Sequence, residues 1–170
     1  NSRLIKTATS ISCKGCDHIV AISNQVKDDL INNFNVNADK ITTIYNPALK
    51  IKFGKLKRRK HNTNLTSKSC INVARLTEQK GQWHLIRAFS EVVKKHADAK
   101  LFILGQGPLK ELLQELIDDY RLNDNVFLMG FVDNPYYYME KARCFVFSSL
   151  YEGLGNALLE AMTCGTPIIS

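Results

Sequence analysis

The chain has 170 residues and a formal net charge of +7, with 45% hydrophobic and 23% charged residues. This length accommodates one domain, or one domain with a piece of another, and the composition is that of a soluble globular protein. The apolar runs fall short of the ~20 residues that span a bilayer, which argues against an integral membrane protein. Five cysteines, an odd number, favour a reducing compartment over a disulfide framework, so we expect a cytoplasmic protein.

The first part of the chain is predicted to contain two short strands around one helix. Residues 1–12 show no clear amphipathic period. Residues 17–23 form an apolar strand that ends in a helix-capping serine, and residues 24–33 carry apolar side chains at helical spacing. Residues 41–45 form a second strand, which Asn46-Pro47 breaks.

A basic stretch follows, and residues 48–68 are the best candidate for a linker. Seven of its basic side chains lie between residues 50 and 60: Lys50, Lys52, Lys55, Lys57, Arg58, Arg59 and Lys60. Such a run can contact nucleic acid, anionic lipid headgroups or a lipid-linked diphosphate. No aromatic platform accompanies it, so we expect no nucleic acid partner. A solvated loop and peripheral contact with the inner face of the cell membrane remain as alternatives.

From residue 69 onward, predicted strands and amphipathic helices alternate. The strands cover residues 70–74, 100–104, 125–129, 144–147 and 168–169. The helix after the second strand is predicted to place five side chains inward: Leu109, Leu112, Leu113, Leu116 and Ile117. Repeated βα units predict an α/β fold, a Rossmann-like parallel sheet with helices on both faces that binds ligands at the carboxyl ends of its strands.

The most informative stretch is a glycine-bearing turn between the strand 144–147 and the following helix. Free backbone amides and the helix dipole suit a phosphate or sugar–phosphate oxygen there. Glu152 and Glu160 frame the turn. If both were helical they would lie about 12 Å apart at ~1.5 Å per residue, beyond the ~5–9 Å of a hydrolase pair. They are therefore expected to contact two parts of one long ligand, although isolated glutamates in a loop and on a helix are usually solvated.

The surrounding pattern resembles the signature of family 4 retaining glycosyltransferases of GT-B fold. It consists of Glu152-(seven residues)-Glu160, with Gly153 and Gly155 between and Ala161, Gly165 and Pro167 after. The resemblance implies that Glu152 contacts the donor sugar and Glu160 the ribose hydroxyls of a nucleotide. It also implies that backbone amides hold sugar and phosphate oxygens, and these belong to Gly153, Leu154, Gly155 and Asn156.

Arg75 and Lys80 lie in one loop after the strand 70–74. Two cations there would stabilise the charge of a departing nucleoside diphosphate without a metal. As isolated residues they would be ordinary loop cations, but residues 74–81 are similar to the diphosphate loop of the family. The resemblance therefore implies that Arg75 and Lys80 act with Glu152 as the catalytic group.

Two further loops follow strands. Gly105-Gln106-Gly107 suggests a dinucleotide fingerprint, but Lys110 replaces its third glycine, which disfavours hydride transfer. The resemblance implies instead that Gly105 lies near the nucleotide. Phe131 and Val132 occupy the loop with which members of the family cover the base, although Phe131 is equally compatible with a core position.

Acidic pairs occur at Asp28-Asp29 and Asp118-Asp119, and neither has the Asp-x-Asp form that holds a divalent cation in other transferases. We therefore expect no metal, and no cofactor besides the nucleotide-sugar donor, which is a substrate.

The resemblance divides the chain into three parts. Residues 1–47 are the tail of an N-terminal GT-B domain, 48–68 the linker, and 69–170 a nucleotide-sugar-binding domain that is incomplete at its C-terminus. The implied reaction transfers a hexosyl or N-acetylhexosaminyl group, with retention, from a nucleotide-sugar that is preferably UDP-linked. The acceptor would be a glycan or a lipid-linked glycan in surface-polysaccharide synthesis. An inactive nucleotide-binding fragment and a nucleotide-sugar epimerase of the same fold remain as alternatives.

Overall fold

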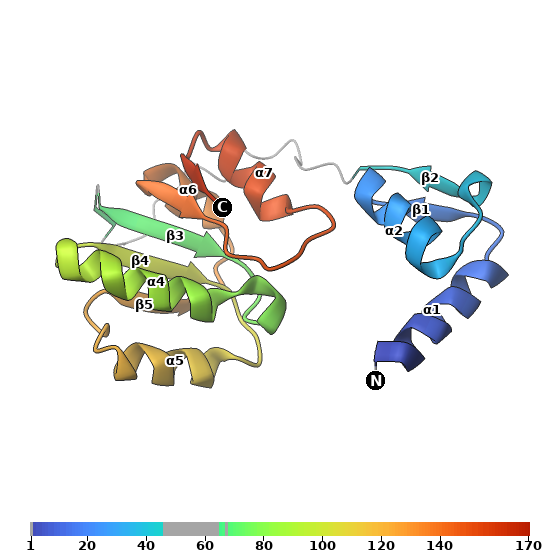
Figure 1. Ribbon diagram of the computed structural model, residues 1–170. Coiled ribbons are helices and arrows are strands. Elements are labelled where there is room, and N and C mark those ends of the chain that lie inside the picture. The colour runs from blue at the N-terminus through green and yellow to red at the C-terminus, as the bar shows by residue number, and fades with distance from the viewer. Residues whose placement is uncertain (1, 46–64, 67) are drawn as a thin grey trace. The chain divides into compact units, whose positions relative to one another are not determined.

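The computed structural model describes residues 2–45, 65–66 and 68–170 (Figure 1). The basic stretch Lys50–Lys60 lies outside the described residues. The chain divides into two compact units, one within the first 47 residues with Gly153–Gly155 grouped to it, and one within residues 48–170. In the part of the chain that the structure describes, no helix is long and apolar enough to cross a membrane.

The first unit contains two parallel strands and their helices. Its elements are α1 (Ser2–Gly15), β1 (Ile19–Ala21), α2 (Asn24–Phe34), η1 (Ala38–Lys40) and β2 (Ile41–Thr43). Ser23 caps α2 as predicted, because its hydroxyl accepts a hydrogen bond from the Val26 amide at 3.2 Å. Helix α1 is amphipathic, so the expectation that residues 1–12 lack a clear amphipathic period is wrong. The helix contacts α2 through the Ser10 hydroxyl, which donates to the Phe34 carbonyl oxygen at 3.0 Å.

The second unit is a five-stranded sheet with helices between its strands. Its elements are β3 (Ser69–Val73), η2 (Glu78–Lys80), α4 (Gln82–Lys95), β4 (Lys100–Leu104), α5 (Lys110–Asp119), β5 (Val126–Gly130), α6 (Pro135–Lys141), β6 (Cys144–Val146), α7 (Asn156–Thr163) and β7 (Ile168–Ile169). The strand order is β5-β4-β3-β6-β7, and every pairing is parallel. This arrangement confirms the predicted Rossmann-like α/β fold.

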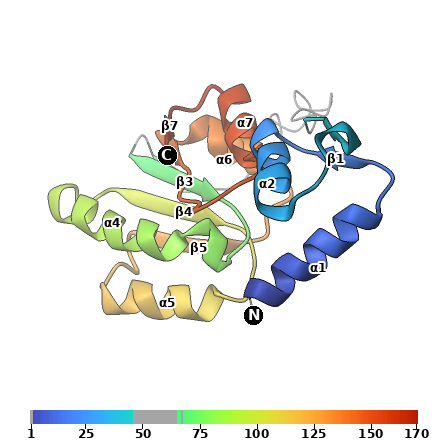
Figure 2. The ribbon, with the colours of Figure 1, turned by 45° about the vertical axis from the view of Figure 1, so that its right-hand side comes forward.

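Helices cover both faces of the sheet, as Figures 1 and 2 show. Strand β4 alternates between the two faces: Leu101 and Ile103 pack with α4 and α5, while Phe102 and Leu104 pack with α6 and α7. Because a strand that is buried on both faces has no polar side, β4 appears in the sequence as a continuous apolar run.

One predicted inward position is wrong. Leu112 is 51% exposed, although its neighbour Leu113 and Ile117 are fully buried. The helix turns by about 100° per residue, so the face of α5 that Leu113 and Ile117 share turns Leu112 outward. The predicted strands are otherwise present, with bounds that differ by one or two residues.

Candidate functional site

The carboxyl ends of β3 and β6 mark the topological switch point of the sheet. The chain runs from β3 to β4 and β5 on one side, and then returns to β6 on the other side of β3. The loops after β3 and β6 therefore leave the sheet in opposite directions, which opens a crevice where open α/β sheets bind their ligands. Residues 74–81 follow β3 and residues 147–155 follow β6, so both sequence-predicted loops reach this edge.

An ion pair joins the two loops. The Lys80 ammonium contacts Oε1 of Glu152, and the Ser149 hydroxyl donates to the same oxygen at 2.9 Å. The Lys80 and Glu152 side chains are only 15% and 19% exposed. The structure thus brings together two predicted catalytic residues, while Arg75 lies exposed at the end of β3.

Backbone contacts reinforce this junction. The Leu150 amide donates to the Gln79 carbonyl oxygen at 2.8 Å, and the Ser148 hydroxyl donates to the Lys80 carbonyl oxygen at 2.8 Å. Gly81 permits the close approach: its φ is +62°, and a Cβ there would lie 2.3 Å from the Ser148 carbonyl oxygen. Only glycine fits this position without moving the loop.

The Asn72 side chain links β3 to β6 just before the two strands end at the switch point. Register pairing between β3 and β6 covers Cys70 and Ile71 but not Asn72. The Asn72 side chain is buried, and its amide donates to the Val146 carbonyl oxygen at 2.9 Å. This side-chain hydrogen bond therefore continues the contact between β3 and β6 beyond their last paired residues. The sequence analysis missed this role; the visible signal was a polar residue inside an apolar strand.

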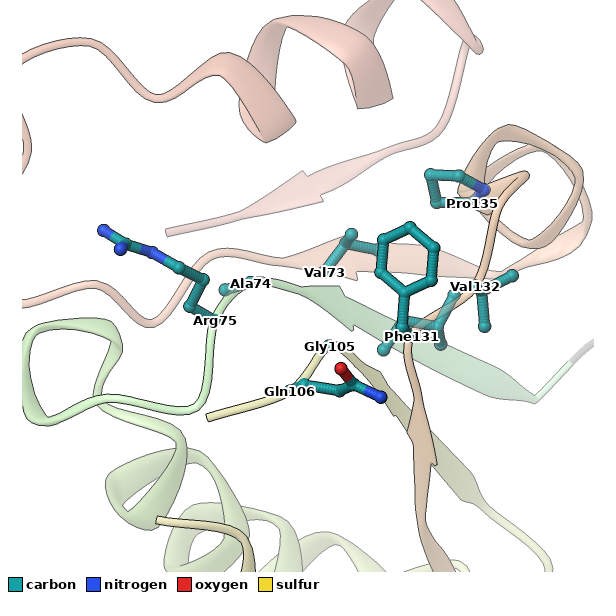
Figure 3. Close-up of a pocket in the computed structure, with 9 residues that line it drawn as sticks. Val73, Ala74, Arg75, Gly105, Gln106, Phe131, Val132 and Pro135 are labelled. Atoms are coloured by element: carbon teal, nitrogen blue, oxygen red, sulfur yellow. The ribbon is translucent and has the colours of Figure 1, made fainter. Parts of the chain in front are cut away.

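A cavity of about 350 Å³ lies beside the switch point, at the ends of β3, β4 and β5 (Figure 3). Its lining consists of Val73, Ala74, Arg75, Leu104, Gly105, Gln106, Phe131, Val132 and Pro135. Figure 3 shows Arg75 and the Phe131 ring on opposite sides of it. Phe131 is 69% exposed, so the core alternative for this residue is wrong. The cavity thus joins four predicted site residues: Arg75, Gly105, Phe131 and Val132.

Gly105 allows the wall of this cavity to form. Its φ is +143°, and a Cβ would lie 1.9 Å from the Ala74 carbonyl oxygen. The adjoining loops are hydrogen-bonded, because the Leu76 amide donates to the Gln106 carbonyl oxygen at 3.0 Å. A side chain at residue 105 would separate the loops after β3 and β4.

Glu160 lies on α7 and is half-buried. Burial raises the pKa of the Glu160 carboxyl, and a hydrogen bond from the Tyr136 hydroxyl to Oε1, at 3.2 Å, partly offsets this rise. Burial and the Glu160 charge in turn raise the pKa of Tyr136. Tyr136 is the next residue along α6 after Pro135, which lines the cavity, so the Tyr136–Glu160 hydrogen bond connects α7 to the helix that begins at that wall. The sequence analysis did not identify Tyr136.

The remaining predicted residues lie around α7. Gly153, Leu154 and Gly155 belong to the loop that precedes it, and Asn156 is its first residue. Within residues 2–45, 65–66 and 68–170, no group of three or more His, Cys, Asp or Glu side chains is placed to hold a metal ion.

These features define a Rossmann-like α/β domain with a ligand crevice at its topological switch point. Residues 54–170 match the model of the family "Glycosyl transferases group 1", and residues 1–48 match that of "Glycosyltransferase Family 4". The chain therefore belongs to the group 1 glycosyl transferases.

Two curated relatives and one solved structure illustrate the similarity. An uncharacterized glycosyltransferase of Methanocaldococcus jannaschii is 54% identical over 100 residues, which cover 59% of this chain and 25% of that protein. The N-acetylgalactosamine-N,N'-diacetylbacillosaminyl-diphospho-undecaprenol 4-alpha-N-acetylgalactosaminyltransferase of Campylobacter jejuni is 34% identical over 99% of this chain and 45% of its own length.

The solved structure is a mutant of Staphylococcus aureus TarM in complex with fondaparinux, alpha-GlcNAc-glycerol and UDP. It superposes with a TM-score of 0.78 at 27% identity, over 96% of this chain and 31% of that one. The chain thus spans between a quarter and about a half of these proteins.

Proposed function

We propose that the protein transfers a hexosyl or N-acetylhexosaminyl group from a UDP-linked sugar to a glycan or lipid-linked acceptor, with retention of configuration. The observation that carries the proposal is the junction at the switch point, where the Lys80–Glu152 pair joins the loops after β3 and β6. UDP in the TarM complex and the diphospho-undecaprenol acceptor in the name of the Campylobacter enzyme support these classes of donor and acceptor. Retention rests on the resemblance to the family.

Each part of the UDP-sugar donor is assigned to a group of residues at the carboxyl ends of the strands. The base occupies the cavity of about 350 Å³, with Phe131 and Val132 beside it. The Glu160 carboxylate accepts hydrogen bonds from the ribose hydroxyls, next to Tyr136. The diphosphate meets Arg75 and Lys80, and the sugar meets Glu152 and the amides of residues 153–156.

The chemical contribution of the site is electrostatic. As the bond between the sugar and the diphosphate breaks, negative charge develops on the departing phosphate, and prepositioned cations stabilise it most. In the structure the Lys80 ammonium is paired with Glu152. We infer that a donor phosphate takes over one hydrogen bond of Lys80 and that Glu152 then turns to the sugar hydroxyls. The residues supply both cations themselves, so the proposed reaction needs no metal.

Calorimetry tests the donor assignment. UDP should bind in the presence of a chelator, and GDP and NAD should bind more weakly. Because the Phe131 ring is 69% exposed, Phe131→Ala should leave folding unchanged and weaken UDP binding by roughly 1–3 kcal/mol, the value of one base–aromatic stack. Exclusive binding of NAD, or strict dependence on a divalent metal, would contradict the proposal.

A product assay on the full-length protein tests the reaction. Radiolabelled UDP-sugars are incubated with lipid-linked and soluble glycan acceptors, and NMR of the product reports its anomeric configuration. Transfer with retention supports the proposal. Release of an epimerised sugar without any acceptor would assign an epimerase instead.

A further inference from the structure

A pair of thiols lies at the amino end of the sheet, opposite the candidate site. Cys70, the second residue of β3, and Cys144, the first residue of β6, are register partners, and their Sγ atoms lie 3.4 Å apart. Partners in a parallel ladder project from the same face, so the two thiols face each other. Neither is in a disulfide; Cys144 is 8% exposed and Cys70 is partly buried.

The backbone geometry of this pair suits a disulfide. Neighbouring strands lie ~4.7–4.9 Å apart, and disulfides join Cα atoms that are ~4.4–6.8 Å apart. The Sγ atoms must approach from 3.4 Å to the ~2.05 Å of an S–S bond. Rotation of the two side chains, together with a small approach of the two Cβ atoms to the ~3.5–4.5 Å that a disulfide needs, would supply this movement without a change of register.

The two thiols are chemically unequal. The hydrogen bond between the two thiols lowers the pKa of Cys144; burial opposes this effect, and the positive charge of Arg143 adds to it. The same hydrogen bond, together with burial, raises the pKa of Cys70. Cys144 is therefore the more readily ionised thiol of the pair and the one expected to act as the nucleophile.

We propose that Cys70 and Cys144 form a reversible dithiol–disulfide site that a hydroperoxide oxidises. The Cys144 thiolate attacks one peroxide oxygen, the O–O bond breaks, and hydroxide leaves, so that Cys144 becomes a sulfenic acid. The Cys70 sulfur then attacks Sγ of Cys144, the S–O bond breaks, and the Cys70 proton leaves with hydroxide as water. In total, two thiols lose two electrons and two protons, and hydrogen peroxide becomes two waters. External thiols reverse the bond by exchange.

A disulfide between Cys70 and Cys144 would tie together the two strands that lead to the candidate site. Cys70 and Cys144 are 74 positions apart, and their strands carry the two halves of the switch-point junction at the opposite ends. A disulfide would join β3 and β6 covalently below Asn72. The proposal does not depend on which sugar the protein transfers.

Peptide mapping of the full-length protein tests the proposal. The native protein is treated with hydrogen peroxide, alkylated, and digested with trypsin and a Glu-specific protease, which release residues 69–75 and 144–152 as separate peptides. We expect these peptides to be disulfide-linked and to separate after dithiothreitol treatment. Cys164 is the matched control, because it is also 8% exposed and its Sγ lies 3.8 Å from the Tyr136 carbonyl oxygen rather than beside a thiol. Cys144 should react at least about tenfold faster than Cys164.

Variants test whether Cys70 forms the disulfide with oxidised Cys144 or only packs beside it. In Cys70→Ala, Cys144 should proceed to the sulfinic acid instead of the disulfide. Cys13→Ala with Cys16→Ala should leave the linked peptides unchanged. The proposal is overturned if wild-type Cys144 reaches the sulfinic acid as readily as in Cys70→Ala, or if Cys144 remains alkylatable when Cys164 is oxidised.

Discussion

Lys80 and Glu152 are 72 positions apart, yet their side chains form a mostly buried ion pair. Each charge has lost most of its water, so its partner and the Ser149 hydroxyl must supply the interactions that water would have made. The pair therefore supports the junction of the two loops as well as the proposed chemistry. Removing one member leaves the other charge poorly solvated.

We expect Lys80→Met to lower the free energy of unfolding by about 1–3 kcal/mol, because it leaves the Glu152 carboxylate without its cation. Adding Glu152→Gln to this variant should restore part of the loss, since the remaining buried group is then neutral. Guanidinium denaturation measures both effects. The matched control is the Lys68–Asp98 pair, whose side chains are 55% and 64% exposed; Lys68→Met should cost only about 0–1 kcal/mol. Equal costs for the two lysine variants would contradict the assigned role.

The negative charge of Glu160 is expected to lower the stability of the fold and to strengthen UDP binding. Burial raises the pKa of its carboxyl, so the folded protein keeps the proton to higher pH than the unfolded chain does. The stabilisation from the protonated form is complete below the unfolded-state pKa and is lost as the pH rises through the folded-state pKa. At pH 7 the ionised Glu160 therefore lowers stability.

Glu160→Gln should accordingly raise the unfolding free energy at pH 7 and remove this part of the pH dependence. The same change should weaken UDP binding by about 1.5–3 kcal/mol, because a charge-assisted hydrogen bond to the ribose is lost. Denaturation across pH and calorimetry with UDP and 2′-deoxy-UDP measure the two effects. Glu115→Gln on the exposed face of α5 serves as the control. A variant that still prefers UDP over 2′-deoxy-UDP by the full margin would show that Glu160 does not contact the ribose.

At the scale of elements, the site depends on how closely the loops after β3, β4 and β6 approach. Gly81 and Gly105 permit these approaches, because a Cβ at either would come within 2.3 Å of a carbonyl oxygen. Gly107 has the same function, with the Leu76 carbonyl oxygen 2.3 Å from its ideal Cβ. Gly105, which the resemblance places near the nucleotide, thus also serves loop packing.

Gly105→Ala should destabilise the protein by more than about 1–3 kcal/mol, since it combines a strained φ with a backbone clash. It should also weaken UDP binding, because the wall of the cavity must shift. Gly15→Ala is the matched control: nothing lies within 4 Å of its ideal Cβ, and at the last residue of α1 alanine should change stability by less than the ~0.5–1 kcal/mol of a mid-helix position. Thermal denaturation and UDP calorimetry distinguish the two. Normal stability and binding in Gly105→Ala would contradict the described loop geometry.

At the scale of the whole molecule, the excess of positive charge has no role in the fold or in the candidate site described above. The net charge is +7, and seven basic residues lie between residues 50 and 60, outside the described residues. We propose that this stretch contacts anionic headgroups, where each Lys or Arg contributes about 1 kcal/mol. Such contact would bring the protein to a lipid-linked acceptor.

Vesicle co-sedimentation tests this proposal. The protein should bind vesicles that contain phosphatidylglycerol, and replacing Lys57, Arg58, Arg59 and Lys60 with glutamine should reduce binding by at least about tenfold, given ~1 kcal/mol per charge. Binding should also fall with added salt, because exposed charges are screened. Neutral phosphatidylcholine vesicles provide the control. Equal binding to both kinds of vesicle would indicate that the basic stretch is only a solvated loop.

The sequence by itself determined the elements and the class of fold, because both depend on local periodicity. Apolar runs of strand length, amphipathic helices and glycine turns recur from residue 69 onward, and the structure contains the predicted parallel sheet. The same local pattern placed Arg75, Lys80 and Glu152 in loops that follow strands, and Glu160 on the helix after one of these loops. It missed α1, although Leu4, Ile5, Ala8 and Ile11 recur there at helical spacing.

Tertiary structure alone decided which side chains from distant parts of the sequence contact each other. Lys80 with Glu152, Tyr136 with Glu160, and Cys70 with Cys144 are separated by 72, 24 and 74 positions. Their contacts follow from the order β5-β4-β3-β6-β7, in which β6 returns beside β3. Local periodicity specifies that a strand forms but not which strand lies next to it, since that choice depends on how the helices cover both faces of the complete sheet.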